Sequence, residues 1–347
     1  MKAVVWRGLY DLEYCDMPEP ECKAGWIKIK VQAVGLCATE AHIISGRFEA
    51  GKPPHILGHE ICGDIVEVGA GCNPDNIGKR VVVETYVGCG KCEFCKSGRK
   101  HLCSTGEIGY PPYAGGDAQY VVVPEGCVRF LKDNISYDEG AIMEAVACPF
   151  GAVINSELRE GQTVLVLGAG VAGLSFIQSA LALGAKQVLC AVRNDTKAEL
   201  VKRFGGTVID LRTQNLHETV MAFTNAMGVD LAIDAAGVPA TIAQCFENVK
   251  NGGKVMLYGI PSKDAVVELP VVDCILRQIT VCGYTGNEKA WDKLIEFVSE
   301  GKISLKEMIT EILPLSKFSK AMDLLENGGS RIIKVVLHPW EDEHDRI

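Results

Sequence analysis

The 347-residue chain has no long apolar stretch. A membrane-spanning helix needs roughly 20 consecutive apolar residues, and the strongest candidate, VLVLGAGVAGLSFIQSALALGA, is interrupted by glycines. The N-terminal residues, MKAVVWRGLYDLEY, have no basic region followed by an apolar one, so we expect no secretory signal. We therefore expect a soluble protein that stays in the cytoplasm.

Positive charge is also in short supply. The chain has 35 Lys and Arg residues against 44 Asp and Glu residues, which gives a formal net charge of −9. Nucleic acids and anionic membranes are bound by clustered Lys and Arg, so we expect a small-molecule partner, with no nucleic acid and no membrane. A composition that is 48% hydrophobic and 23% charged is typical of globular proteins. The length suits two domains.

Cysteine, by contrast, is abundant, with 15 residues. In a reducing cytoplasm thiols stay unpaired, so a close cluster indicates a metal site rather than disulfides. Cys89, Cys92, Cys95 and Cys103 follow the spacing C-x2-C-x2-C-x7-C. Four thiolates complete the tetrahedron around zinc and leave no position for a substrate, so we interpret this cysteine lobe as a structural zinc site. The alternatives are four buried free thiols or an iron–sulfur site, although the spacing differs from ferredoxin patterns.

A second set of metal ligands lies in other glycine-containing segments. Cys37 lies in VGLCATEAHIISG, His59 and Glu60 lie in ILGHEICGDIVEVG, and Glu144 lies in the apolar segment GAIMEAVACPFGAV. A buried carboxylate such as Glu144 is costly unless it meets a cation. Three or four mixed ligands with room for water are typical of a catalytic zinc. Taken singly, each of these residues is more often structural.

A glycine-rich turn predicts a nucleotide site. The run TVLVLGAG ends in Gly168, Gly170 and Gly173, in the order G-x-G-x-x-G, and a helical segment and a second apolar run, QVLCAV, follow. In such a strand–helix–strand unit the glycines let a dinucleotide pyrophosphate approach the helix N-terminus. We also predict cofactor contacts at Val171, Ala172 and Ala236.

Together these motifs resemble the zinc-dependent medium-chain dehydrogenase/reductase family, closest to its polyol (sorbitol) dehydrogenase and threonine dehydrogenase branches. The resemblance runs from KAVVW at the start to IIKVVLHP near the end. It implies an α/β chain with a β-rich, GroES-like catalytic domain in residues 1–150, completed by about 286–347. Residues 151–285 would form a Rossmann domain with a doubly wound parallel sheet.

The same resemblance implies roles for the predicted ligands. Cys37, His59 and either Glu60 or Glu144 match the catalytic zinc positions, and the cysteine lobe matches the structural zinc. In polyol dehydrogenases the carboxylate beside the histidine binds zinc directly and the later one acts through water, whereas other branches use the later residue. The sequence alone does not choose.

The family also places a proton relay in CATEAH. Thr39 and His42 match the hydroxyl and the imidazole that pass the substrate proton through the cofactor ribose to solvent. The alternative is that Thr39 is a local capping hydroxyl and His42 a surface residue.

These roles imply an oxidoreductase that transfers a hydride between a secondary alcohol and a nicotinamide cofactor and gives the ketone. YPPYAGGDAQYVVV resembles the polyol dehydrogenase stretch near the substrate, which favours a polyol, a sugar alcohol or its phosphate, or a cyclitol. Sorbitol itself is not favoured, because GYTGNEKAW lacks the Arg that sorbitol dehydrogenases carry there, and Pro149 replaces a family glycine behind Glu144. Two alternatives are a zinc-free quinone or enoyl reductase, which would lack the cysteine lobe, and a non-catalytic redox sensor.

The second strand of the nucleotide unit departs from the usual NAD pattern. An acidic residue normally ends this strand and binds the ribose hydroxyls, but here Val192 occupies that position and Arg193 follows it. A guanidinium, with Lys197 near it, suits the 2′-phosphate of NADP. We therefore predict a preference for NADP(H), with NAD(H) possible. The alternative is that Asp195 binds the ribose after a two-residue shift.

An apolar segment near residue 270 predicts self-association. AVVELPVVDCILRQITVCGY contains strand-like runs that we place at the edge of the nucleotide sheet. Exposed sheet edges need covering, so we predict a homodimer or a homotetramer.

Overall fold

The structure is a computed structural model that describes residues 1–287 and 289–340. Its internal contacts divide the chain into two compact units. Unit 1 comprises residues 1–145, 291–299 and the described residues from 305 onward, and unit 2 comprises residues 146–290 and 300–304. The first boundary falls within helix α3 (Tyr137–Asn155), which runs from one unit into the other.

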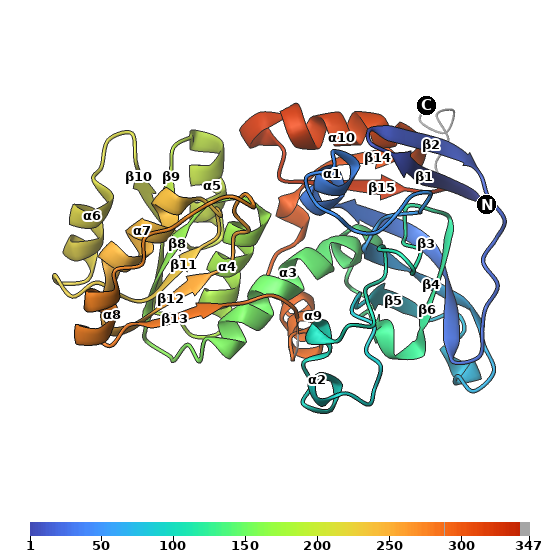
Figure 1. The fold of residues 1–347 in the computed structure, drawn as a ribbon, viewed down its shortest axis with the longest axis horizontal. Coiled ribbons are helices and arrows are strands. Elements are labelled where there is room, and N and C mark those ends of the chain that lie inside the picture. Colours follow the sequence, from blue (N-terminus) through green and yellow to red (C-terminus); the bar gives the residue numbers. More distant parts are fainter. Residues whose placement is uncertain (288, 341–347) are drawn as a thin grey trace. The chain divides into compact units, whose positions relative to one another are not determined.

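Unit 1 is built on a mixed sheet of mainly antiparallel strands (Figure 1). Its strand order is β14-β15-β3-β4-β5-β7, β6 also pairs with β3, and only β14 and β15 run parallel within this set of described strands. The strands are β3 (Trp26–Leu36), β4 (Glu60–Val68), β5 (Arg80–Val83), β6 (Tyr120–Pro124), β7 (Val128–Phe130), β14 (Ile309–Pro314) and β15 (Lys334–His338).

Strand β3 is the centre of this unit. Its side chains alternate between buried and partly exposed over the first half, and Ile27, Ile29 and Val31 are fully buried in the core, as expected for a strand with one face on a core. The register pairs Gly35 of β3 with Glu60 of β4 on one side and with Val336 of β15 on the other. Residues far apart in the sequence are thereby brought to one end of β3.

The remaining elements of unit 1 surround this sheet (Figure 1). Strands β1 and β2 form an antiparallel hairpin of their own, and short helices lie in the connections. The elements are β1 (Lys2–Gly8), β2 (Asp11–Asp16), α1 (Ala38–Ile44), α2 (Glu93–Lys96), α9 (Trp291–Ser299) and α10 (Phe318–Asn327).

Unit 2 is a six-stranded parallel sheet with helices in its connections (Figure 1). Its order, β10-β9-β8-β11-β12-β13, reverses between β8 and β11, which is the switch point where doubly wound sheets bind dinucleotides. The strands are β8 (Thr163–Leu167), β9 (Gln187–Val192), β10 (Thr207–Asp210), β11 (Val229–Asp234), β12 (Val249–Leu257) and β13 (Thr280–Gly283). The helices are α4 (Val171–Ala182), α5 (Asp195–Arg203), α6 (Leu216–Phe223), α7 (Pro239–Asn248) and α8 (Val271–Leu276).

The expected edge of this sheet is present, with one difference. Strand β13 is the edge strand, but the apolar run before it forms helix α8 instead of a strand. Pro270 lies at the N-cap of α8, where a residue without an N–H is tolerated, whereas a strand ladder needs that donor. Among the described residues, no helix has the length and apolar character needed to cross a membrane.

Candidate active site

Three predicted ligands meet at the end of β3. One ligand atom each of Cys37, His59 and Glu60 lies within 4.8 Å of the other two. Cys37 is the N-cap residue of α1, directly after β3, while Glu60 is the first residue of β4 and His59 precedes it. The β3–β4 register therefore brings the thiol, the imidazole and the carboxylate together, and His59 and Glu60 are buried.

The carboxylate of Glu60 has one paired and one unpaired oxygen. Its Oε1 forms an ion pair with Nζ of Lys334, and its buried Oε2 has no partner within the part of the chain that the structure describes. A Cβ atom at Gly35 would lie 2.2 Å from that Oε2, so only glycine leaves room for the carboxylate. An unpaired buried oxygen is costly unless a cation satisfies it.

Lys334 was missed by the sequence analysis. It begins strand β15, is 3% exposed, and lies 274 residues from its partner Glu60. Burial lowers the pKa of Lys334, but the charges of Glu60 and Cys37 outweigh it and raise that pKa overall. The available signal was a lone lysine at the start of the apolar run KVVLH.

The donor set of this site fits zinc. Burial raises the pKa of the Cys37 thiol to about 11, an effect that Lys334 partly offsets. A bound divalent cation deprotonates a coordinating thiol, and zinc accepts sulfur, nitrogen and oxygen ligands together. Three protein ligands would leave the fourth position of a tetrahedron for another group.

Glu144 lies near these ligands but outside the group of three. It is on α3 and is 7% exposed, and burial raises its pKa to about 8. The charge of His59 partly offsets that shift, whereas Glu60 and Cys37 increase it. Glu144 is thus within electrostatic reach of all three predicted ligands.

Two further buried carboxyl groups, Glu40 on α1 and Asp117, lie near the predicted ligands. Glu40 Oε2 accepts a hydrogen bond of 2.8 Å from the Cys37 backbone N–H. Burial raises the pKa of Asp117 to about 7, and the charge of Glu60 adds to that shift. The Glu40 Oε1 and both carboxylate oxygens of Asp117 are buried and have no hydrogen-bond partner among the described residues, and burial also raises the pKa of Glu40. The sequence analysis named neither residue.

The two predicted relay residues lie on α1 and differ in exposure. The Oγ1 of Thr39 is 3.5 Å from the Cys37 Sγ. His42 is exposed, although partial burial of its ring and the charge of Arg47 lower its pKa. The structure therefore places the hydroxyl beside the thiol and the imidazole at the surface of unit 1.

A cavity of about 270 Å³ opens beside His59 within unit 1. The ring of Tyr110 stacks on the His59 ring, with centroids 5.4 Å apart and an angle of 29° between the planes. Tyr110 Oη is 3.4 Å from His59 Nδ1. The cavity is lined by Phe48, Ala50, Gly106, Glu107, Tyr110 and Pro111.

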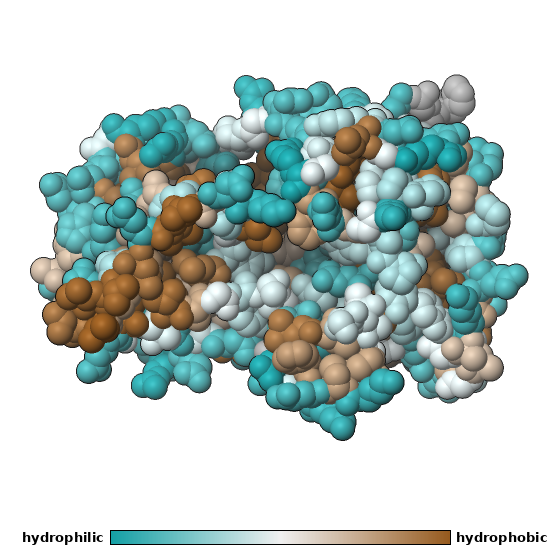
Figure 2. Space-filling view, in the orientation of Figure 1, coloured by the Kyte–Doolittle hydropathy of each residue, from teal (hydrophilic) through white to brown (hydrophobic). Residues whose placement is uncertain are grey.

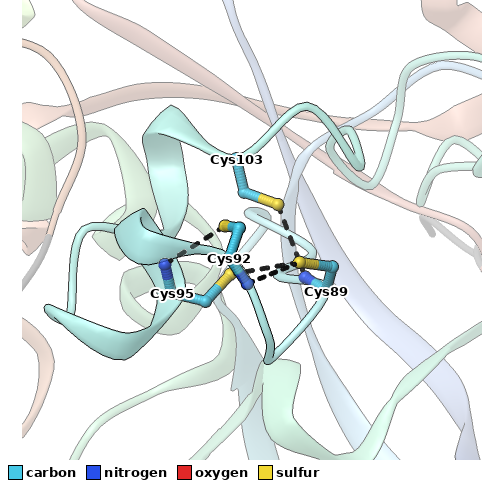
Figure 3. A group of neighbouring side chains, drawn as sticks. All are labelled: Cys89, Cys92, Cys95 and Cys103. Carbon is cyan, nitrogen blue, oxygen red and sulfur yellow. Dashed lines mark hydrogen bonds between the residues drawn. The ribbon is translucent and has the colours of Figure 1, made fainter.

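The four cysteines of the predicted lobe also come together (Figure 3). One Sγ atom from each of Cys89, Cys92, Cys95 and Cys103 lies within 4.8 Å of the others. Helix α2 begins after Cys92, and the Sγ atoms of Cys89, Cys92 and Cys103 accept hydrogen bonds from backbone N–H groups of the lobe itself. The arrangement is that of a closed tetrathiolate centre.

Local hydrogen bonds tune the thiols of the lobe. A hydrogen bond with Thr105 contributes most to lowering the pKa of Cys103 to about 6, so this thiol ionises readily and can bind a metal. Behind the lobe, the buried carboxylate of Glu84 pairs with Lys100 at 2.9 Å and with Arg129. Lys100 therefore anchors the lobe to the sheet.

In unit 2 the predicted glycine motif closes the turn between β8 and α4. Gly170 is the N-cap residue of α4, and Gly168 has a φ of +112°. A Cβ atom at Gly173 would lie 1.8 Å from the carbonyl oxygen of Gly168, so a larger residue cannot fit there. The other predicted contacts lie close by, because Val171 and Ala172 begin α4 and Ala236 follows β11, the neighbour of β8.

The end of β9 exposes a basic residue. Val192 is buried and Arg193 is exposed. Asn194 caps α5 by accepting a hydrogen bond of 2.9 Å from the Lys197 N–H. Asp195 pairs with Arg212 at 2.6 Å, and this pairing lowers the pKa of Asp195. Arg212, which the sequence analysis missed, thus occupies the carboxylate of the alternative ribose-binding residue.

Comparisons with known proteins agree with this architecture. Residues 23–133 match the family described as the alcohol dehydrogenase GroES-like domain, and residues 172–300 match the zinc-binding dehydrogenase family. The chain is 31% identical to sorbitol dehydrogenase of Bacillus subtilis (strain 168), covering 98% of this chain and 97% of that protein. It is 30% identical to D-arabitol-phosphate dehydrogenase of Enterococcus avium, covering 96% of each.

A solved structure is similar over nearly the whole chain. A zinc-binding dehydrogenase from Sinorhizobium meliloti 1021, solved with NADP bound, has a TM-score of 0.90 and 31% identity, covering 97% of this chain and 99% of that one. The expected fold class, a GroES-like domain with a Rossmann domain, is confirmed. The chain belongs to the zinc-binding alcohol dehydrogenases, in the branch with sorbitol and threonine dehydrogenases, and is an oxidoreductase that transfers a hydride between an alcohol and a nicotinamide cofactor.

Proposed function

We propose that this enzyme oxidises a secondary hydroxyl of a polyol or sugar alcohol to a ketone, at a zinc held by Cys37, His59 and Glu60. The observation that carries the proposal is the convergence of these three ligand atoms within 4.8 Å around a buried, unpaired oxygen of Glu60. The similarity to a sorbitol dehydrogenase and an arabitol-phosphate dehydrogenase supports the substrate class.

Each residue around the ligands has a distinct task in this proposal. A zinc ion bound here would supply a Lewis acid that lowers the pKa of the substrate hydroxyl. Lys334 neutralises one oxygen of Glu60 and leaves the other for the metal. Glu144 lies next to the ligand set rather than in it, and its carboxyl group adjusts the charge of the site.

Thr39 and His42 would move the proton that leaves the substrate hydroxyl. The Thr39 hydroxyl lies beside the Cys37 thiol, and His42 is three residues further along α1 and exposed. Its lowered pKa favours a neutral imidazole at pH 7, which can accept a proton and release it to water.

A second zinc, bound by Cys89, Cys92, Cys95 and Cys103, would be structural. The four Sγ atoms form a closed set, and the pKa values of Cys89 and Cys103 are lowered by local hydrogen bonds. This gives two zincs per chain, one catalytic and one structural.

Metal content and turnover together test the proposed function. We expect about two zincs per chain by elemental analysis, and oxidation of at least one free polyol in a panel of sugar alcohols, cyclitols and diols. Two zincs without turnover of any panel member would favour a redox sensor. Turnover of a quinone or an enone by a protein stripped of zinc would favour the zinc-free reductase.

We also propose NADP(H) as the preferred cofactor, with NAD(H) as a weaker alternative. Arg193 is exposed after β9, Lys197 lies one turn into α5, and Arg212 already pairs with Asp195. The similar structure from S. meliloti binds NADP.

Kinetics with both cofactors test this preference. Arg193→Ala should weaken the binding of NADP by about 1.5–3 kcal/mol, which is the typical contribution of a hydrogen bond to a charged group, and should leave the binding of NAD nearly unchanged. Arg203→Ala, at the far end of α5, is the matched control. A higher kcat/KM for NAD in the unmodified enzyme would refute the assignment.

For assembly we propose a homodimer, or a tetramer made of such dimers. An apolar patch lies over α8 and β13 (Figure 2), and the edge strand β13 pairs only with β12 among the described strands. A second copy would bury the patch and the edge together. The exposed apolar residues are Ile260, Val266, Leu269, Val271, Val272, Ile275, Leu276 and Val281. Sedimentation that shows only a 37.4 kDa species at micromolar concentration would contradict this.

We also propose limits for the two domains and a cellular location. We propose a GroES-like domain in residues 1–150 that is completed by about 286–347, and the division between residues 145 and 146 supports this limit. We propose a cytoplasmic location, because all 15 cysteines are free thiols.

A further inference from the structure

The cavity beside His59 contains one charged side chain. Glu107 is the one carboxylate among the six described lining residues, and those six include no Lys or Arg. The nearest basic residue in sequence, Arg47, pairs with Glu326 at 3.2 Å. A ligand in this cavity therefore meets a carboxylate without a counter-charge in the lining.

The backbone of Glu107 is fixed, while its carboxylate is unengaged. The residue forms an isolated β-bridge with Tyr86, and its carbonyl oxygen accepts a hydrogen bond from the Tyr110 N–H. Within residues 1–287 and 289–340, no group donates a hydrogen bond to the Glu107 carboxylate. Burial raises the pKa of this group, and the charge of His59 partly offsets that shift. A partly buried carboxylate that lacks donors is ready to accept a hydrogen bond from a ligand.

The cavity neighbours the candidate metal site, and Tyr110, which lines the cavity, also contacts His59. The Tyr110 ring stacks on His59, and the charge of Glu107 acts on both Tyr110 and Glu144. Phe48, Ala50 and Pro111 give the remaining wall an apolar surface, which suits the carbon face of a polyol chain.

We propose that Glu107 is a specificity-determining residue that accepts a hydrogen bond from a second hydroxyl of an uncharged polyol and excludes phosphate esters. This inference rests on the proposed polyol oxidation. A phosphate would place its charge against the carboxylate, and the lining offers no cation to compensate. A neutral hydroxyl donor satisfies the carboxylate without that repulsion. The substrate class thereby narrows to free polyols.

Paired substrates test the inference. The zinc-loaded enzyme is assayed with arabitol, xylitol, sorbitol and galactitol, each against its phosphate ester, and with L-threonine as an amino alcohol. We expect kcat/KM to favour the free polyol. Glu107→Gln removes the negative charge of the side chain and keeps its shape. It should therefore lower the ratio of kcat/KM for the free polyol to kcat/KM for its phosphate ester by about 10- to 100-fold.

Glu49→Gln is the matched control, because Glu49 is an exposed neighbour of Phe48 that does not line the cavity. Glu49→Gln should leave the ratio of kcat/KM for the free polyol to kcat/KM for its ester within about twofold of the value for the unmodified enzyme. If Glu107→Gln does not fold, the preference of the unmodified enzyme for free polyols over their phosphate esters still tests the inference.

The outcomes separate this inference from the proposed function. Turnover of free polyols with an equal or higher kcat/KM for their esters, or an equal effect of Glu107→Gln and Glu49→Gln, would overturn the inference alone. A preference for L-threonine over every free polyol would also overturn it. Absence of any turnover by the zinc-loaded enzyme would overturn both.

Discussion

The two candidate metal centres of unit 1 are assembled in opposite ways. The cysteine lobe takes its four ligands from 15 consecutive residues, and its sulfurs interact with backbone N–H groups of that segment and with the nearby hydroxyl of Thr105. The site at Cys37, His59 and Glu60 depends on Lys334 from β15, near the other end of the chain. A local centre such as the cysteine lobe can form wherever its loop closes. The site at Cys37, His59 and Glu60, called the mixed site below because its ligands differ in type, requires the whole sheet of unit 1.

This difference has an energetic side. The four cysteines of the lobe are only partly buried, and although burial raises the pKa of Cys95 to about 11, local hydrogen bonds lower the pKa values of Cys89 and Cys103. The mixed site gathers several buried carboxyl groups around one buried lysine, which is costly unless charges are paired. We therefore expect changes in the lobe to affect stability and changes in the mixed site to affect chemistry.

The sharpest contrast is between replacing a ligand in each centre. Cys37→Ser or His59→Ala should lower kcat by roughly 1,000-fold or more, because several kcal/mol of charge stabilisation is lost, with the fold retained. Cys95→Ser should instead lower the free energy of unfolding by about 3–5 kcal/mol and keep measurable turnover. Zinc analysis should find one ion fewer in each case. Equal loss of activity at unchanged stability in all three variants would erase the distinction.

Removing the lysine of the mixed site should cost stability there as well. Lys334→Met leaves the buried carboxylate of Glu60 without its partner, and breaking such a pair typically costs about 3–5 kcal/mol. Urea unfolding of the zinc-loaded protein measures this. Lys302→Met, which removes an exposed pair with Glu300, should change stability by less than about 1 kcal/mol. Equal effects of the two variants would show that burial of the Glu60 pair does not matter.

Glycine substitutions compare the space around the two centres. Gly35→Ala would place a Cβ 2.2 Å from Glu60 Oε2 and displace that carboxylate, so kcat/KM should fall by about 10- to 100-fold. Gly88→Ala would place a Cβ 3.0 Å from Cys95 Sγ, a contact that a small shift relieves, so activity should stay within about twofold. A larger loss of kcat/KM for Gly88→Ala than for Gly35→Ala would contradict the assignment of catalysis to the site at Glu60 and of a structural role to the cysteine lobe.

A pH-dependent effect is expected at Asp117. Its pKa is raised from 3.8 to about 7, so between these values the folded protein holds a proton that the unfolded chain releases. Stability from this group is therefore complete below about pH 4 and declines as pH rises to about 7.

Asp117→Asn removes the titratable group while keeping its shape, so it should remove that decline. We expect the variant to gain about 4 kcal/mol relative to the unmodified protein at pH 8, and nothing at pH 4, because a shift of roughly three pKa units corresponds to about that free energy. Thermal unfolding across this range measures the difference. Asp16→Asn, an exposed substitution, is the control, and a constant difference between Asp117→Asn and the unmodified protein at all pH values would contradict the assignment.

The local motifs were predictable from the sequence, and the long-range partners were not. The spacing of the four cysteines and of Gly168, Gly170 and Gly173 identified both features, because the residues that meet are close in sequence. Lys334 could not be found this way, because only the pairing of β15 with β3 brings it to Glu60. Helix α8 was mistaken for a strand because a six-residue run with five apolar residues carries no clear periodicity.

The two turns of the nucleotide-binding unit differ in how freely their sequences can vary during evolution. The Gly173 position accepts no side chain, so the turn between β8 and α4 is closed to substitution. Arg193 is exposed and α5 is capped independently by Asn194, so residue 193 can change without disturbing the sheet. On the proposed role of Arg193, descendants of this enzyme could exchange NADP for NAD by surface substitutions alone, while the glycine turn between β8 and α4 stays the same.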